Sequence, residues 1–509
     1  MTTAQICIMI SITVYLIGML GIGVICSKQN NSTDDFYLGG RKLGPFVTAM
    51  SAEASDMSSW LLMGLPGVAY LSGICDAGWT AIGLAAGTYL NWLFVAKRIR
   101  RYSHIAGNAI TIPDFFTNRY RDNSKLLMLF SALFILIFFV PYTASGFAAC
   151  GKLFSSLFGI DYLTAMIISA LVIVGYTVMG GFLAASTTDF IQSIVMTIAL
   201  LIVLIFGTHM AGGMDAVMEN AKALPGYLSM FFTHSRETGE AVPYGSVAIV
   251  STMAWGLGYF GMPHILLRFM AIEDENKLTL SRRIATVWVV ISLTIGVIIG
   301  IIGFGMTKAG NMAELVGSDS ETIIIRVANL LSQFGVFPAL IAGVILAGIL
   351  ACTMSTADSQ LLAAASGVSQ NIFKGVMRID LSEKAMIIVA RATVLAISVI
   401  AMFIARNPDS SVFAIVSFAW AGFGACFGPV VLCALFWKRS NRNGALAGMI
   451  AGGAVVFVWK YMVRPIGGIW NIYELLPAFI AALIAIVAVS LMTAPPEQEI
   501  LDEFERARK

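Results

Sequence analysis

The stretch SAEASDMSSWLLMGLPG, residues 51–67, places two carboxylates inside a long apolar region of the chain. Glu53 and Asp56 stand among four serines, and Gly64 and Pro66 follow them. A charged side chain at the centre of a bilayer costs from about 3 to more than 10 kcal/mol unless it is paired or hydrated. Glycine and proline also keep the segment from forming a plain helix, so its composition calls for a functional reason.

The overall composition indicates a membrane protein. Of the 509 residues, 58% are hydrophobic and 12% are charged, whereas a soluble domain carries about 25% charged residues. Long apolar runs, such as residues 6–26, suit the length of about 20 residues that a membrane-spanning helix needs. No basic residue precedes this first run and no small-residue cleavage site follows it, so we expect a retained span rather than a signal peptide.

Hydropathy predicts an all-α polytopic membrane protein with about thirteen transmembrane helices. The expected spans are 4–27, 45–71, 76–97, 126–151, 161–180, 189–211, 245–270, 284–307, 337–366, 385–405, 411–437, 444–463 and 470–492. We expect residues 321–335 to form an amphipathic helix outside the membrane.

The positions of lysine and arginine predict the orientation. If the N-terminus lies outside, 23 of the 32 lysines and arginines fall on cytoplasmic connections and eight on outer ones. This asymmetry follows the positive-inside rule. We therefore expect an integral protein of the plasma (cytoplasmic) membrane, with the N-terminus outside and the C-terminus cytoplasmic. The net charge of +3 then reflects topology, and we expect no nucleic-acid partner.

Several other protein classes are disfavoured. The longest connections, 212–244 and 98–125, are too short for a soluble catalytic domain. No serine is patterned with a buried histidine as in an enzyme, and no filter-like loop indicates a channel. The seven cysteines form no CxxC and the four histidines are scattered, so we expect free thiols and no zinc or haem site. No signalling domain follows the last expected span, which disfavours a membrane sensor.

A secondary transporter explains the opening stretch. In many such proteins a helix breaks at mid-membrane, and its freed carbonyls and hydroxyls coordinate the coupling ion. Sodium, a hard cation, should favour these oxygen ligands, and Asp56 would hold the positive charge or fix the broken backbone. In the alternative interpretation the serines bond their own helix, and Glu53 and Asp56, at i and i+3, reach the surface on one helix side.

A second oxygen-rich stretch is LACTMSTADSQLLAAASG, residues 350–367. Ser355 and Ser359 would share one face of a helix, with Thr356 and Asp358 beside them. Serine and threonine also serve as helix-packing residues. Together with the broken segment, however, the stretch predicts a cation site in two parts.

Five segments carry a resemblance that extends over nearly the whole chain. They are RKLGPFVTAMSAEASDMSSWLLMGLPG (41–67), YTVMGGFLAASTTDFIQ (176–192), WGLGYFGMPHILLRFMA (255–271), MSTADSQLL (354–362) and FGPVVLCALFWKRSNRNGALAGM (427–449). They resemble the sodium/solute symporter family. GGFLA before an aspartate is a signature of the family as a whole, whereas ASDMSSWLLMGLPG and WGLGYFG are more specific and resemble its sodium/proline branch.

The resemblance implies a core of two five-helix inverted repeats with broken helices. One extra span would precede this core and two would follow it. The chain would then divide into an N-terminal span with a cytoplasmic loop, a first repeat, a second repeat, and two C-terminal spans with a cytoplasmic tail: 1–44, 45–211, 245–437 and 438–509.

By the same resemblance, the main sodium site would consist of five oxygen ligands. Three are the backbone carbonyls of Ala54, Met57 and Cys352, and two are the hydroxyls of Ser355 and Thr356. Asp56 matches a family aspartate tied to sodium binding. Cys352 replaces a commonly small residue, which matters little if only its carbonyl is used.

Asp189, after GGFLA, matches a position associated with a second sodium site in some members, which Ser359 could join. Asp189 could instead be a helix N-cap or a first-turn acid at the cytoplasmic start of a span, favoured by the helix dipole, and Asp358 could be a packing residue. Both interpretations stay open, and we expect a single coupled sodium.

The substrate site would recognise a small zwitterion with an apolar ring, using backbone amides and aromatic walls that can face an amine. The resemblance implies that six residues line it: Ser58, Trp60, Tyr142, Trp255, Tyr259 and Pro263. Aromatic residues in spans also serve as packing or interface residues. Met262 and Glu53 depart from the family pattern, and Glu53 could pair with Arg41 or Lys42.

The resemblance implies a sodium-coupled symporter that imports L-proline by alternating access. Sodium would be the coupling ion, and membrane lipid would surround the protein. No obligate protein partner is evident from the sequence. The main alternative is a sodium symporter for pantothenate, a monocarboxylate, a sugar or a sialic acid. A proton-coupled carrier using Glu53 and a membrane sensor are weaker alternatives.

Overall fold

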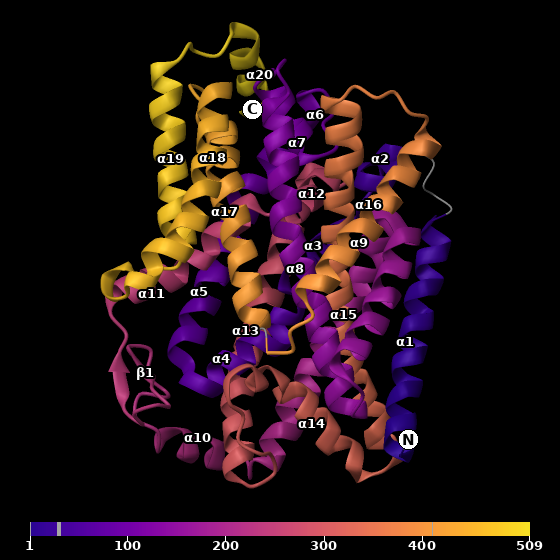
Figure 1. The fold of residues 1–509 in the computed structure, drawn as a ribbon, viewed down its shortest axis with the longest axis vertical. Helices are drawn as coiled ribbons and strands as arrows, with labels where there is room; N and C mark the ends of the chain where they lie inside the picture. Colours follow the sequence, from indigo (N-terminus) through magenta and orange to yellow (C-terminus); the bar gives the residue numbers. More distant parts are fainter. Residues whose placement is uncertain (1, 28–31, 410, 509) are drawn as a thin grey trace.

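The computed structural model describes residues 2–27, 32–409 and 411–508, and almost all of them are helical (Figure 1). The long helices lie side by side in one bundle, with the N-terminus at its lower end and the C-terminus near its upper end. A short antiparallel hairpin of β1 (Phe232–His234) and β2 (Ala241–Pro243) lies at the lower end beside α10.

The first half of the chain forms ten α-helices: α1 (Thr3–Ser27), α2 (Thr33–Leu38), α3 (Pro45–Ser59), α4 (Leu65–Ser72), α5 (Ile74–Leu90), α6 (Ala96–Ile105), α7 (Ile112–Arg119), α8 (Leu126–Phe158), α9 (Tyr162–Met210) and α10 (Met214–Lys222). The second half forms ten more: α11 (Ser246–Met253), α12 (Pro263–Ala271), α13 (Leu278–Lys308), α14 (Ile323–Leu331), α15 (Val336–Ser366), α16 (Glu383–Ile404), α17 (Val412–Phe436), α18 (Arg442–Val458), α19 (Leu475–Met492) and α20 (Gln498–Arg508).

The expected all-α membrane class is confirmed. Within the described ranges, nine helices are long and apolar enough to cross a membrane. All thirteen ranges expected as spans fall on helical structure, several of them on bent or broken helices. The count of thirteen is compatible with this arrangement and stays a prediction. The ranges 161–180 and 189–211 form the single stretch α9, whose backbone breaks at Gly181, where φ is 66°.

The helix that contains the opening stretch is broken as predicted. Its backbone leaves the helical conformation at Ser58, where φ is 47° and ψ is −173°. A wide turn, η2 (Trp60–Gly64), then leads into α4. Glu53 and Asp56 are 1% and 5% exposed, so the two acids lie inside the protein and do not reach the surface together.

A second broken helix lies about 200 residues later in the chain. It consists of α11, the 3₁₀ segment η4 (Ala254–Gly261) and α12, with the extended residue Met262 between the last two. Pro263 opens α12 at the first helical position, where the missing N–H of proline removes no helical hydrogen bond. The broken helices expected from the sequence thus lie at these two positions, and α9 is interrupted as well, at Gly181.

Two glycines let α5 lie directly against the second broken helix. A Cβ atom added to Gly83 would collide with the backbone of Met253, and one added to Gly87 would collide with the backbone of Gly256. Backbone meets backbone here, so no side chain can rearrange to relieve a collision. The position of η4 relative to α5 therefore depends on these glycines.

We expect Gly87→Val to destabilise the protein by about 1–3 kcal/mol or more, because the added atoms must displace the η4 backbone. The midpoint of thermal unfolding in detergent micelles measures the effect. Gly21→Val is the matched control, since a Cβ atom at Gly21 would have no described atom within 4 Å apart from its chain neighbours and the backbone of its own helix. Equal midpoints for the two variants would contradict the close contact.

Candidate sodium and substrate site

Oxygen atoms from α3 and α15 meet at the centre of the bundle. The Ser355 hydroxyl on α15 donates to the Ala54 carbonyl on α3 at 2.8 Å, and its oxygen is also 3.2 Å from the Cys352 carbonyl. The Thr356 hydroxyl donates to the Cys352 carbonyl at 3.0 Å. All four residues are buried. We call these two carbonyls and two hydroxyls the oxygen cluster.

The other two residues expected at the sodium site lie next to the oxygen cluster rather than in it. The Met57 carbonyl stands at the helix break, where it accepts from the Trp60 backbone N–H. The Asp56 carboxylate accepts a hydrogen bond from the Tyr259 hydroxyl on η4, and its other oxygen, Oδ1, is buried without a hydrogen-bond partner among the described residues. Asp56 therefore faces the second broken helix.

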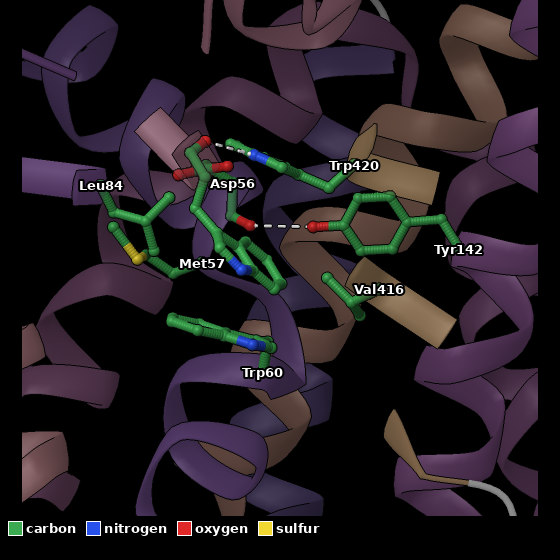
Figure 2. A pocket seen from close by; sticks show the side chains of 8 residues that line it. Asp56, Met57, Trp60, Leu84, Tyr142, Val416 and Trp420 are labelled. Atoms are coloured by element: carbon green, nitrogen blue, oxygen red, sulfur yellow. Dashed lines mark hydrogen bonds between the residues drawn. The ribbon is translucent and has the colours of Figure 1, made fainter. Parts of the chain in front are cut away.

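Asp56 also lines a small pocket with aromatic walls, which we call the aromatic pocket (Figure 2). Its volume is about 10 Å³, close to the smallest space that holds one water molecule. Its lining residues are Asp56, Met57, Trp60, Leu84, Tyr142, Trp255, Val416 and Trp420. Four of the six residues expected at the substrate site, namely Trp60, Tyr142, Trp255 and Tyr259, thus line the pocket or bond to its carboxylate.

Several contacts hold the pocket walls in place. The Tyr142 hydroxyl donates to the Asp56 backbone carbonyl at 3.1 Å, as Figure 2 shows. The Trp420 indole N–H donates to the Trp255 carbonyl at 2.7 Å. The rings of Trp60 and Trp255 lie 5.6 Å apart. The pocket is therefore fixed by both broken helices together with α8 and α17.

Residues of α17 were missed by the sequence analysis. The ring centroid of Phe413 lies 5.9 Å from that of Trp60 and 5.4 Å from that of Trp255. Val416 and Trp420 line the pocket. The stretch FAWAGFG in this span, with its alternating aromatic and small residues, could have drawn attention to this wall. In an otherwise apolar helix, however, such residues also indicate ordinary packing.

A second, polar cavity links the aromatic pocket with the oxygen cluster. Its lining residues are Ser58, Ser59, Tyr142, Thr143, Ser145, Gly146, Thr353, Thr356, Ala357 and Gln360. Tyr142 also lines the aromatic pocket, and Thr356 also belongs to the oxygen cluster. Ser58 lines the polar cavity, where its hydroxyl accepts from the Trp60 N–H. Pro263 lines neither space, because it begins α12 beyond the extended residue Met262.

Asp189 and Ser359, expected as a possible second sodium site, share a buried arginine. Arg268 on α12 is 1% exposed and forms an ion pair with Asp189 at 3.1 Å. It also donates to the hydroxyls of Ser51 and Ser359, and the Ser51 hydroxyl donates to Asp189 at 2.7 Å. We call these four residues the Arg268 cluster. It joins α3, α9, α12 and α15.

The Arg268 cluster changes two of the sequence interpretations. Asp189 lies eight residues after the break at Gly181, so it is not a first-turn acid. Arg268, one of the 23 basic residues assigned to cytoplasmic connections, is instead buried among helices. The position of Arg268 inside the expected span 245–270 could have indicated that it is buried. The many basic residues on the same side of the membrane made it look like one more residue of a cytoplasmic connection.

Glu53 is a buried carboxylate without a cationic partner among the described residues. One of its oxygens, Oε1, accepts from the Trp92 indole at 2.7 Å and from the Thr88 hydroxyl at 3.1 Å. Neither basic residue suggested as a partner contacts it. Arg41 bonds to Asn108, Ser103, Met270 and Ala109 instead, and Lys42 lies near Asp35.

The oxygen cluster suits an alkali cation. It offers uncharged carbonyl and hydroxyl oxygens, the ligand type that hard cations prefer, and its helix is interrupted one turn further on. No group of three or more histidine, cysteine, aspartate or glutamate side chains that could hold a metal ion occurs within the described ranges. Carbonyl and hydroxyl oxygens, by their own chemistry, suit hard cations better than soft transition metals.

These features define the class of protein. A membrane-spanning bundle whose two broken helices bring hydroxyls, carbonyls and a carboxylate to its centre has the architecture of a secondary transporter. The chain belongs to the sodium:solute symporter family, whose model matches residues 36–452. The resemblance noted from the sequence motifs is thereby confirmed.

Curated relatives match this chain over nearly its whole length. A sodium/proline symporter of Haemophilus influenzae is 44% identical over 98% of this chain and 97% of its own. The high-affinity proline transporter PutP of Bacillus subtilis is 43% identical over 96% of this chain and 98% of its own. The osmoregulated proline transporter OpuE of the same organism is 42% identical over 96% of this chain and 95% of its own.

A solved structure has the same fold. The substrate-bound, outward-open state of a Na⁺-coupled sialic acid symporter superposes with a TM-score of 0.78, covering 97% of this chain and 99% of the other at 18% sequence identity. MhsT in complex with L-phenylalanine is more distant, with a TM-score of 0.51 and 13% identity over 88% of this chain and 99% of the other. These likenesses confirm the expected fold class.

We expect Arg268→Met to lower the free energy of unfolding by about 3–5 kcal/mol, because it leaves the Asp189 carboxylate buried and unpaired. The double variant Asp189→Asn/Arg268→Met should lose less than the sum of the two single variants. Denaturant titration in mixed micelles measures all three. Lys277→Met, which removes an exposed ion pair with Glu273, should leave stability unchanged. If the losses of unfolding free energy in the two single variants simply added up in the double variant, direct pairing of Arg268 with Asp189 would be contradicted.

Proposed function

We propose that this chain is a sodium-coupled symporter that imports L-proline. The observation that carries the proposal is the hydrogen bond between Ser355 on α15 and the Ala54 carbonyl on α3. Ala54 stands two residues before Asp56, whose carboxylate lines the aromatic pocket. An ion site and a substrate pocket thus share one interrupted helix. The relatives named as proline transporters support the choice of substrate.

We propose that sodium binds in the oxygen cluster, with the Met57 carbonyl completing the ligand set from the helix break. A cation there would replace the hydroxyl–carbonyl hydrogen bonds by coordination of the same oxygens. Its charge would be neutralised from nearby by the carboxylate of Asp56. The sodium ion is cargo in this reaction, since it moves with the substrate.

The aromatic pocket would hold the zwitterion once its walls move apart, because its volume of about 10 Å³ in this structure admits only about one water molecule. Within the described part of the chain, Asp56 Oδ1 is a buried acceptor without a partner, and the Trp60 indole N–H is a buried donor without a partner. These two groups complement the amine and the carboxylate of an amino acid. The rings of Trp255 and Tyr142 would then enclose the apolar ring of proline. We therefore place the side chain of Asp56 on the substrate's amine rather than directly on sodium.

Coupling would follow from the shared helix. Sodium in the oxygen cluster would hold α3 against α15 and thereby fix Asp56 for the substrate, and by linkage the substrate would tighten sodium binding to the same degree. Inward movement of one positive charge contributes about 2.3 kcal/mol per 100 mV of membrane potential. The fixed Arg268 guanidinium, bound to Asp189 and Ser359, supports a single coupled sodium.

The proposal includes the expected placement in the membrane. The N-terminus would lie outside and the C-terminus in the cytoplasm of a plasma membrane protein, and 45–211 and 245–437 would be the two inverted repeats. Opposite positions of the termini in the bundle (Figure 1) support an odd number of crossings. No obligate protein partner forms part of the proposal.

We expect reconstituted vesicles to accumulate labelled L-proline only with an inward sodium gradient. Replacing sodium by choline at fixed pH should abolish uptake, and unlabelled proline should compete where pantothenate, lactate, glucose and sialic acid do not. Undiminished uptake in choline would instead favour a proton-coupled carrier using Glu53, and competition by another solute would identify a different substrate.

We expect Ser355→Ala to affect mainly sodium binding and Asp56→Asn to affect mainly substrate binding. Loss of one hydroxyl ligand in Ser355→Ala should raise the half-saturating sodium concentration by about tenfold. Asp56→Asn should mainly raise the half-saturating proline concentration by about tenfold, because the substrate's amine loses a charged partner. Uptake is measured against each ligand with the other saturating.

Ser366→Ala on the same helix is the matched control, because this hydroxyl bonds only to a carbonyl of its own helix. A sodium dependence left unchanged by Ser355→Ala would contradict the oxygen cluster as the ion site. If Asp56→Asn shifted the sodium dependence alone, its carboxylate would belong to the ion and not to the substrate.

A further inference from the structure

Tyr473 reaches the substrate site from a part of the chain beyond the range that the family model matches. It lies at the end of the α18–α19 connection, between η11 (Gly468–Trp470) and α19, whereas the matched range ends at residue 452. Its ring stacks on the ring of Trp255, with 5.1 Å between centroids and 19° between planes. Trp255 lines the aromatic pocket and Tyr473 does not, so Tyr473 supports this wall from behind.

Two hydrogen bonds hold Tyr473 between α11 and α17. Its backbone N–H donates to the Ser251 hydroxyl on α11 at 2.7 Å, where the α18–α19 connection lies beside α11 (Figure 1). Its hydroxyl donates to the Ser417 carbonyl on α17 at 2.6 Å. Val416, the residue before Ser417, lines the aromatic pocket. Tyr473 therefore joins two walls of the pocket, one on each broken or bent helix that it contacts.

Ion pairs fix the α18–α19 connection that carries Tyr473. Glu474, the next residue in the chain, has a fully buried side chain and pairs with Lys460 at 3.4 Å and with Arg464 at 2.7 Å. A buried carboxylate holds its cations firmly, because leaving it unpaired is strongly unfavourable. The two ends of the connection are thereby linked, and Tyr473 cannot easily move away from Trp255.

This arrangement limits how far the aromatic pocket can widen. The pocket must widen before a substrate enters, because its volume of about 10 Å³ admits only about one water molecule. Retreat of the Trp255 indole would widen it, but Tyr473 occupies the space behind this ring. An extra methylene group is worth about 10- to 200-fold in selectivity in a hydrophobic pocket, provided that the walls do not yield.

We propose that Tyr473 is a positioning residue that fixes Trp255 and thereby limits the ring size of the substrate. The role deepens the proposed function and rests on it. The five-membered ring of proline is accepted with Trp255 in place, whereas the six-membered ring of its homologue pipecolate is excluded. The α18–α19 hairpin, which lies outside both expected five-helix repeats, thus contributes to substrate selectivity.

The test compares variants of the full chain in reconstituted vesicles. Tyr473→Leu removes the stacked ring and leaves space behind Trp255. The half-saturating proline concentration should rise about fivefold at an unchanged maximal rate, because an aromatic pair contributes about two- to tenfold to an equilibrium constant. The ratio of the pipecolate inhibition constant to the half-saturating proline concentration should fall about tenfold. Tyr473→Ile makes the same test if the leucine variant does not fold.

Two further variants separate positioning from general packing. Tyr473→Phe keeps the ring and the backbone bond to Ser251, so both quantities should stay within about twofold of those of the unaltered protein. Tyr461→Leu is the matched control, because Tyr461 belongs to the same connection. Its ring packs against Phe418 and Phe457, neither of which lines the aromatic pocket, so the substitution should change neither quantity.

A lower maximal rate with an unchanged half-saturating proline concentration in Tyr473→Leu would overturn the proposal, because it would indicate ordinary packing. Discrimination against pipecolate that Tyr473→Leu leaves intact would also overturn it, as would an equal loss of discrimination in Tyr461→Leu. If Tyr473→Phe behaved like Tyr473→Leu, stacking on Trp255 would not be the cause. Absence of sodium-driven proline uptake in the unaltered protein would instead contradict the proposed function itself.

Discussion

The bond between the Ser355 hydroxyl and the Ala54 carbonyl is the contact on which the centre of the molecule depends. A backbone interruption inside an apolar bundle leaves polar groups that water cannot reach, and each unsatisfied group costs several kcal/mol. In this chain the interruption at Ser58 is tolerated because hydroxyls of α15 and α8 bond to the carbonyls beside it. Two of these oxygens, the Ser355 hydroxyl and the Ala54 carbonyl, are also ligands of the proposed sodium site.

The second broken helix completes this arrangement from the other side. η4 supplies Tyr259, which bonds to the Asp56 carboxylate, and Trp255, whose carbonyl accepts from Trp420 on α17. Because α5 meets η4 through glycine backbones, the two segments lie closer than side chains would allow. The carboxylate is thereby held between two helices that are both irregular at the same depth.

Some of this site could be predicted from the sequence, and the reasons are physical. Acids, serines, glycine and proline within an apolar stretch contradict a plain span, so the break near Ser58 was predictable, and the hydroxyls of α15 followed from their spacing. The role of Arg268 was not predictable, because a basic residue near the end of a span resembles a topology determinant. Phe413 and Trp420 were missed because packing and pocket aromatics look alike in sequence. Pro263 marks the restart of a helix rather than a pocket wall.

The Arg268 cluster has a consequence for how the molecule can open. Its guanidinium binds partners on three other helices in a region from which solvent is excluded, where separated charges are strongly unfavourable. Those helices cannot part there unless hydration replaces the lost partners at the same moment. Entry of water at the Arg268 cluster and movement of its helices would then occur in a single kinetic step. The activation enthalpy of that step would come mainly from breaking the contacts of the Arg268 guanidinium rather than from the many weak contacts around it.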